Sequence, residues 1–130
     1  MIVVDASAMT ELLLQTDLGR RIEHRLLRDE DLHVPHLVDV EVVSALRRLV
    51  RTGDLPADRA EDAIEDLQLL RLARHGHEDL LPRAWELREN ITAYDAVYVA
   101  LAEALDATLV TCDRAFGAAK SAARVEVISE

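Results

Sequence analysis

The stretch from Ala93 to Leu105 constrains the fold of this 130-residue sequence more than any other, because it is apolar on nearly every side. Its only charged residues are Asp95 and Glu103. A helix of this composition has no polar face to expose to solvent, so it must be buried against a sheet and its neighbours. The segment therefore predicts a central helix in a layered domain.

Short β-branched, apolar runs lie between the helical segments. The runs at 2–4 and 108–112 are typical of strands buried on both faces of a parallel sheet. Weaker runs predict strands at 32–34, 70–73 and 125–128. Strands that alternate with helices indicate βαβ units. We expect a three-layer α/β/α fold with a central, mainly parallel sheet of four to five short strands, in one domain over residues 1–130.

The helices between these strands carry ordinary start and stop signals. Ser7 is predicted to be the N-cap of the first helix, and Gly53 to follow the end of a strongly amphipathic one. The periodicity predicts helices at about 17–28, 37–51, 57–66, 79–89 and 114–119.

The composition excludes several classes of protein. The net charge of −10 argues against a protein that coats nucleic acid through bulk positive charge. Cys112 is the only cysteine, which excludes an intrachain disulfide and cysteine-rich zinc modules. The sequence has no apolar run near the roughly 20 residues of a membrane helix and no secretory pattern, so we expect a cytoplasmic protein.

Four acidic residues are expected to meet at one edge of the sheet. Asp5 ends the first strand and Asp113 follows the strand at 108–112, and ligands of open parallel sheets bind at these carboxyl ends. Asp95 begins the buried helix that leads into the second of these strands. Glu41 borders the core-facing stripe of its helix.

Three of these acids also have an ordinary structural explanation. The alternatives are a capping pair of Asp95 with Thr92, a cap of the following helix by Asp113, and an ion pair of Glu41 with Arg48 or another arginine across a helix face. Asp5 is harder to explain in this way, because an ionised carboxylate that ends an apolar strand needs a partner.

Together the four acids predict a cation site. Carboxylates in one crevice cannot all stay ionised without positive charge, and the only lysine, Lys120, is not beside them. Oxygen ligands favour Mg²⁺ or Mn²⁺ over zinc. Ser7 and Thr111 place hydroxyls two residues from Asp5 and Asp113, either to support these ligands or only as cap and strand residues.

Four motifs in this order resemble the PIN-domain family, and within it the VapC-type toxins of bacterial type II toxin–antitoxin pairs. They are VDASA at 4–8, EVVSALRR at 41–48, TAYDAVYVALA at 92–102 and TCD at 111–113. Asp5, Glu41, Asp95 and Asp113 match the family's acidic quartet, and Thr111 matches its hydroxyl residue before the last acid. Some members carry a further acid shortly after this position, whereas residues 114–118 contain none.

The resemblance implies a PIN-like domain that acts as a metal-dependent endoribonuclease and as a toxin. The quartet would bind one or two Mg²⁺ or Mn²⁺ ions, with Glu41 acting directly or through water. The implied partners are an RNA substrate and a cognate antitoxin, in a homodimer or a toxin–antitoxin hetero-oligomer, with no membrane.

Arginines must supply the RNA contacts of such an enzyme. Arg114 adjoins the last acid and is our candidate. Two further groups lie at 20–28 and 47–51, although single surface arginines commonly only pair with nearby acids.

The main alternative is a non-catalytic PIN-like binding domain with a structural cation or an inactive site. A receiver-like phosphorylation domain is disfavoured, because Ala6 stands where a second acid is needed and residues 106–119 contain no lysine.

Overall fold

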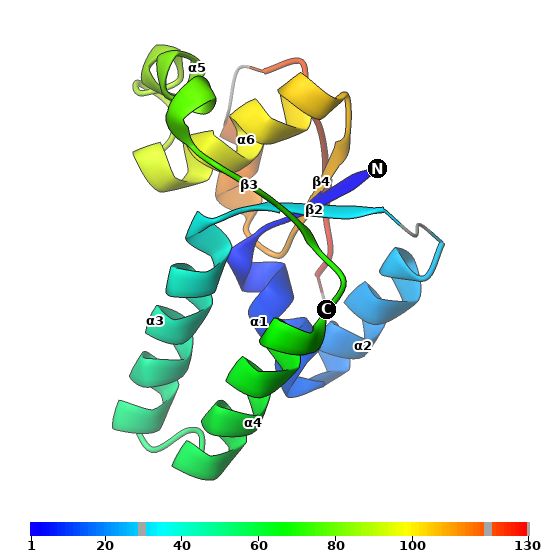
Figure 1. Cartoon of the computed structure of the whole chain (residues 1–130), viewed down its shortest axis with the longest axis vertical. Helices are drawn as coiled ribbons and strands as arrows, with labels where there is room; N and C mark the ends of the chain where they lie inside the picture. Colours follow the sequence, from blue (N-terminus) through cyan, green and yellow to red (C-terminus); the bar gives the residue numbers. More distant parts are fainter. Residues whose placement is uncertain (29–30, 119–120, 130) are drawn as a thin grey trace.

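A five-stranded sheet runs through the middle of the molecule in the order β3-β2-β1-β4-β5 (Figure 1). This computed structural model describes residues 1–28, 31–118 and 121–129, and every strand pairing within them is parallel. The strands are β1 (Ile2–Val4), β2 (Leu32–Pro35), β3 (Ala73–His75), β4 (Thr108–Thr111) and β5 (Arg124–Val127). The predicted number and direction of the strands are confirmed.

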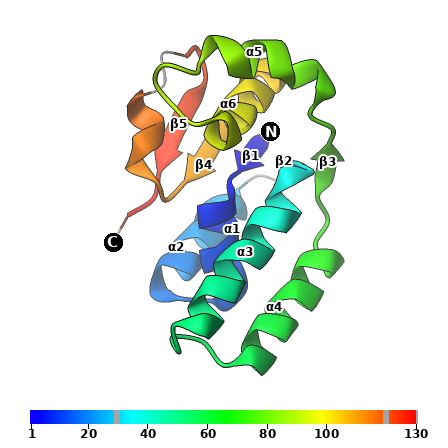
Figure 2. The same ribbon diagram turned by 90° about the vertical axis from the view of Figure 1, so that its left-hand side faces the viewer.

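Helices cover both faces of this sheet (Figures 1 and 2). One layer contains α1 (Ala6–Leu14), α2 (Asp17–Leu26), α3 (Leu37–Arg51) and α4 (Ala57–Leu69), and the other contains α5 (Leu81–Glu86) and α6 (Ala93–Leu105). Two 3₁₀ turns, η1 (Glu78–Leu80) and η2 (Arg114–Ala118), complete the described elements. The predicted three-layer α/β/α fold is confirmed.

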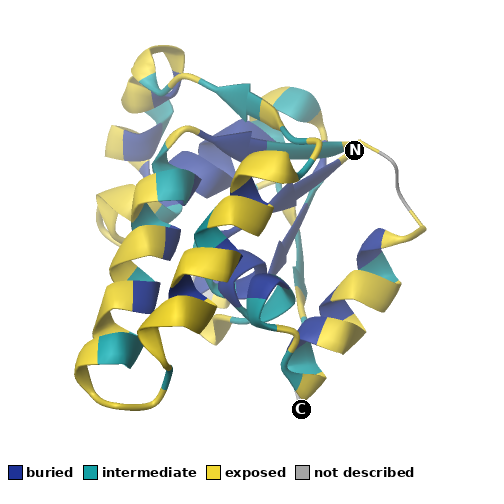
Figure 3. Ribbon diagram, turned by 60° about the horizontal axis from the view of Figure 1, so that its bottom comes forward, coloured by how far each residue is buried: buried dark blue, intermediate teal, exposed yellow. Residues whose placement is uncertain are grey.

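The central helix predicted from the sequence is α6. Its residues 96–102 are all buried, and it packs against β1, β2 and β4. Figure 3 shows the same division across the molecule, with buried residues along the central strands β1 and β4 and exposed residues on the outer sides of the helices. Within the described residues, none of the helices has both the length and the apolar character needed to cross a membrane.

The start of α1 differs from the prediction. The N-cap is Asp5, whose carboxylate accepts a hydrogen bond from the Ala8 backbone N–H at 2.9 Å. Ser7 lies inside the first turn and donates its own hydroxyl to Asp5. A carboxylate at the strand end reaches the free N–H groups of the helix, so it takes the role assigned to Ser7.

The third strand was also predicted in the wrong place. It spans Ala73–His75 instead of 70–73, because α4 continues to Leu69 and buries Leu67 in the core. Other ends shift by a few residues: α2 ends at Leu26, the segment 79–89 divides into η1 and α5, and β5 begins at Arg124. The last turn of the helix predicted at 114–119 falls partly outside the described residues.

Helix α3 is anchored to the edge of the sheet, which positions Glu41. Its first turn has no side-chain N-cap, and His77 Nε2 instead accepts the Leu37 backbone N–H at 2.9 Å. Arg74 of β3 donates two hydrogen bonds of 2.9 Å to Asp39. Gly53, at φ +80°, follows the end of the helix as predicted.

Candidate functional site

The candidate site lies where β1 and β4 end side by side. Val4 pairs with Val110, and the Asp5 backbone N–H donates to the Val110 carbonyl at 3.2 Å. After β1 the chain forms β2 on one side of β1, and it later returns to form β4 on the other side. Ligands of parallel sheets bind at such a reversal of strand order. The topology therefore supplies a crevice at Asp5.

Asp5 is the most enclosed acid of the site, with 4% of its surface exposed. Its Oδ2 accepts the Thr111 hydroxyl at 2.6 Å, and the Ser7 hydroxyl lies 2.8 and 2.9 Å from the two carboxylate oxygens. Burial raises the pKa of Asp5, and the hydrogen bonds from Thr111, Ala8 and Ser7 oppose that rise. Both predicted hydroxyl residues therefore contact Asp5, which they hold in one orientation.

Asp95 shows that the four acids share one electrostatic environment. Its pKa is raised from 3.8 to about 6, first by burial and then by the charges of Asp113, Asp5 and Glu41. Its backbone N–H also donates to the Thr92 hydroxyl at 3.2 Å, so the expected cap of α6 is present as well. Asp95 therefore both belongs to the cap of α6 and lies among the other three acids.

Asp113 is exposed and follows β4 directly. Its backbone N–H donates to Thr111 Oγ1 at 2.9 Å, and its Oδ1 accepts the Ala115 backbone N–H at 2.8 Å. The carboxylate thus caps η2, as the structural alternative predicts. Its charge nevertheless acts on both Asp5 and Asp95. Thr111 links the two strand-end acids, because one hydroxyl contacts Asp5 and the Asp113 backbone.

Glu41 is held by a residue that the sequence analysis missed. The Tyr98 hydroxyl donates to Glu41 Oε1 at 2.6 Å, and Tyr98 itself is only 1% exposed. Burial, followed by the neighbouring Glu41, raises the pKa of Tyr98, which keeps the phenol protonated as a donor. The spacing contained a signal, because Tyr98 lies three residues after Asp95 and so on the same side of α6.

The site contains an excess of negative charge. Among the described residues, no arginine or histidine lies within ion-pairing distance of any of the four acids, so the alternative pair of Glu41 with Arg48 is absent. The described residues also contain no three His, Cys, Asp or Glu side chains already arranged to hold an ion directly. Mg²⁺ keeps several of its waters and binds through one or two carboxylates, so a hydrated ion suits this set.

Cys112 lies beside the acids but does not favour a softer metal. Burial, followed by the charges of Asp5 and Glu11, raises the pKa of its thiol to about 11. Metals bind the thiolate, which is scarce at neutral pH under these conditions. The usable donors are therefore carboxylate oxygens, the ligands that Mg²⁺ and Mn²⁺ prefer.

Arg114 lies next to Asp113 at the start of η2. It is exposed and takes part in no ion pair within the described residues. The guanidinium is therefore available to a ligand.

Comparisons with known proteins identify relatives of this chain. The family model of the PIN domain matches residues 2–121. A VapC ribonuclease of Mycobacterium bovis is 48% identical over 113 residues, which cover 87% of this chain and 86% of the relative. The ribonuclease VapC1 of Mycobacterium tuberculosis is 40% identical over 118 residues, which cover 90% of this chain and 89% of the relative.

Solved structures share the fold. PAE2754 from Pyrobaculum aerophilum has a TM-score of 0.68 at 29% identity, covering 97% of this chain and 83% of that one. VapBC2 from Rickettsia felis was solved bound to a DNA fragment from its promoter. It has a TM-score of 0.72 at 17% identity, covering 99% of this chain and 100% of that one.

Proposed function

The chain belongs to the PIN-domain family, among its VapC ribonucleases, and we propose that it is a divalent-metal-dependent endoribonuclease that acts as the toxin of a toxin–antitoxin pair. The observation that carries the metal requirement is the raised pKa of Asp95, caused by burial and by three further acids without a nearby cation. Bound positive charge would stabilise the ionised form of such a cluster.

The four acids take different parts in the proposed reaction. Asp5, Asp95 and Asp113 would hold one or two Mg²⁺ or Mn²⁺ ions, directly or through water. A bound ion would supply the positive charge that polarises the RNA phosphate and lowers the pKa of the attacking water. Glu41 would orient that water or accept its proton. Ser7 and Thr111 fix the Asp5 carboxylate through the hydrogen bonds described above.

Metal removal tests this function. Purified protein is incubated with ribosomal RNA and tRNA in Mg²⁺, Mn²⁺ or EDTA, and the products are separated by gel electrophoresis. We expect cleavage with either ion, background levels in EDTA, and recovery when the ion is added back in excess. Cleavage that persists in EDTA contradicts the metal requirement. An absence of cleavage under all conditions favours the non-catalytic binding domain instead.

Tyr98 is proposed as a positioning residue for Glu41. Tyr98→Phe removes the donor at 2.6 Å and keeps the ring, so we expect kcat to fall about tenfold or more, as for other partners that orient reacting groups. KM should change little, because the hydroxyl is buried and does not reach the substrate. Steady-state kinetics separate the two parameters.

Tyr94→Phe is the matched control, because it removes a hydroxyl from the same helix at a position that is 61% exposed. It should retain the wild-type kcat. An equal fall in kcat in both variants contradicts the positioning role. So does a fall in kcat in Tyr98→Phe that thermal unfolding explains by a loss of folded protein.

The proposed partners are an RNA substrate and a cognate antitoxin, with the chain in a homodimer or a toxin–antitoxin hetero-oligomer in the cytoplasm. The VapBC2 structure, which shares this fold, supports an antitoxin as the partner. Arg114, exposed beside Asp113, is proposed to contact the RNA phosphate near the cut.

A further inference from the structure

Three arginines lie close together near the end of α3. Arg47, Arg48 and Arg51 are exposed, and within the described residues they form no ion pair. In a chain with 25 acidic and 15 basic residues, most arginines are expected to find a carboxylate. Several do so here: Arg74 pairs with Asp39, Arg83 with Glu103 and Arg124 with Asp106. The three arginines of α3 are therefore free to bind an external anion.

Two adjoining hollows connect these arginines to the acids. The first, about 410 Å³, lies between α1 and α3, with Ser7, Glu41 and Cys112 at the site and Arg48 farther along α3. The second, about 430 Å³, is lined by Ser44, Arg47, Arg48, Arg51 and Thr52. Ser44 and Arg48 line both hollows, so the two form one groove.

The spacing along α3 gives this groove its direction. Glu41, Ser44 and Arg48 are separated by three and four residues, so they lie on one face of the helix. At a rise of 1.5 Å per residue, Arg48 lies about 10 Å along the axis from Glu41. The small residues Ala6 and Ala45 also line the groove, which leaves space for a ligand between α1 and α3.

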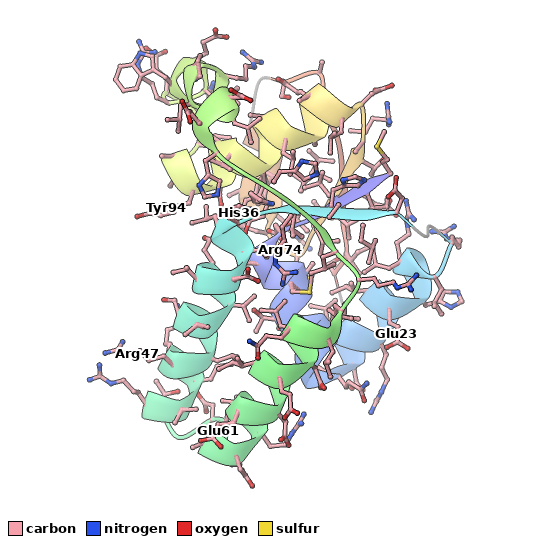
Figure 4. All side chains as sticks on the ribbon, in the orientation of Figure 1. Glu23, His36, Arg47, Glu61, Arg74 and Tyr94 are labelled. Carbon is pink, nitrogen blue, oxygen red and sulfur yellow. The ribbon has the colours of Figure 1, made fainter. Side chains whose placement is uncertain are left out.

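Two acids near these arginines accept hydrogen bonds from threonines and form no ion pair with the arginines within the described residues. Glu11 lines the first hollow, and its carboxylate accepts a hydrogen bond from the Thr16 hydroxyl. Asp54, which follows α3, accepts one from Thr52 at 2.6 Å. Figure 4 shows Arg47 pointing outwards from α3, away from the α4 helix that carries Glu61. Among the described residues, the second hollow is lined by three arginines and no acid, so it keeps a local positive charge in an acidic protein.

We propose that the α1–α3 groove binds the RNA backbone on one side of the cut, with Arg48 on the phosphate nearest the acids and Arg47 and Arg51 on those beyond it. This rests on the ribonuclease function proposed above. Arginine binds phosphate in a bidentate manner, and the hydroxyl of Ser44 is a suitable further donor. The contacts carry no sequence information and serve to hold the strand across the site.

The test measures RNA binding without cleavage. A fluorescein-labelled single-stranded RNA containing all four bases is titrated in EDTA at several salt concentrations, and Kd is read from fluorescence anisotropy. We expect Arg48→Ala to weaken binding about tenfold, the usual scale of one charge-assisted hydrogen bond. The R47A/R48A/R51A variant should lower the slope of log affinity against log salt by about 2, at about 0.7 per lost phosphate contact.

The matched control is R59A/R71A/R88A, which removes the same charge from three exposed arginines outside α3. It should bind RNA nearly as the wild type does. Arg48→Lys should recover part of the RNA affinity that Arg48→Ala loses. Equal losses in the two triple variants, or unchanged binding in R47A/R48A/R51A, would overturn the proposal. Unchanged RNA binding would leave a protein partner as the ligand of these arginines.

Failure of this proposal is distinguishable from failure of the function. A wild type that cleaves RNA only with Mg²⁺ or Mn²⁺, together with an R47A/R48A/R51A variant of unchanged Kd and KM, contradicts the groove alone. If the function and the groove are both correct, the variant raises KM and leaves kcat close to the wild type, because the arginines lie away from the reacting atoms.

Discussion

Asp5→Asn is expected to lower RNA cleavage by at least about a hundredfold while leaving the protein folded. The amide oxygen of asparagine can still accept the Ala8 backbone N–H, because asparagine and aspartate are equally good N-caps. The Ser7 and Thr111 hydroxyls can turn to accept hydrogen bonds from the new amide. Only the negative charge at the centre of the acids is lost.

Two measurements separate catalysis from folding in this variant. Cleavage is measured in excess Mg²⁺, and the free energy of unfolding is measured by urea titration, where we expect a change within about 1 kcal/mol. Asp5→Ala, which also removes the cap, should lose about 1–2 kcal/mol in addition. Asp17→Asn, an exposed acid on α2, is the control and should cleave normally. Full cleavage by Asp5→Asn would contradict the proposed site.

Asp95→Asn is expected to abolish cleavage and to stabilise the metal-free protein at pH 7. In the folded protein the pKa of Asp95 is about 6 against an ordinary value of 3.8, so its ionised form is unfavourable beside Asp113, Asp5 and Glu41. A shift of about 2 pKa units corresponds to about 3 kcal/mol, and solvent screening of this half-buried group reduces that figure. We expect a gain of about 1–2 kcal/mol in the free energy of unfolding.

The pH dependence of this gain gives it a specific signature. Because the pKa is raised on folding, the folded state binds the proton more tightly, and the stability from Asp95 is fully present below about pH 3.8. It is lost as the pH rises through about 6. The variant should therefore match the wild type near pH 4 and exceed it at pH 7, in urea titrations with EDTA.

Asp106→Asn provides the control for this series. Asp106 is an exposed acid, and asparagine readily adopts the left-handed backbone conformation at this position. It should not reproduce the gain at pH 7. An Asp95→Asn variant that is no more stable than the wild type at pH 7, or equally stabilised at pH 4, would contradict the charge repulsion at the site. The pKa of Asp5 is also raised, so some pH dependence should remain in the Asp95→Asn protein.

The sequence predicted the fold and the convergence of the acids through local patterns. A segment without a polar face, at 93–105, requires burial, and it became the helix that packs on three strands. Asp5 and Asp113 follow apolar strands, and the carboxyl ends of neighbouring parallel strands share one edge. These patterns depend on residues a few positions apart, so they can be read without knowledge of the tertiary structure.

Other predictions failed where two local signals competed. Ser7 and Asp5 both suit an N-cap, and only the exact start of α1 selected the carboxylate. The segment 67–73 suited both a helix and a strand, and burial of Leu67 in the core extended α4 at the expense of the predicted strand.

The sequence by itself determined a parallel α/β protein with acids gathered at the ends of two strands, because strand periodicity and chain direction impose that arrangement. Only the tertiary structure decided what these acids contact. The bond from Tyr98 to Glu41 joins residues 57 positions apart, and the bond from Thr111 to Asp5 joins residues 106 apart. The groove that leads to Arg48 exists only because α1 packs beside α3. Such contacts depend on how whole helices pack, and no local pattern in the sequence contains that information.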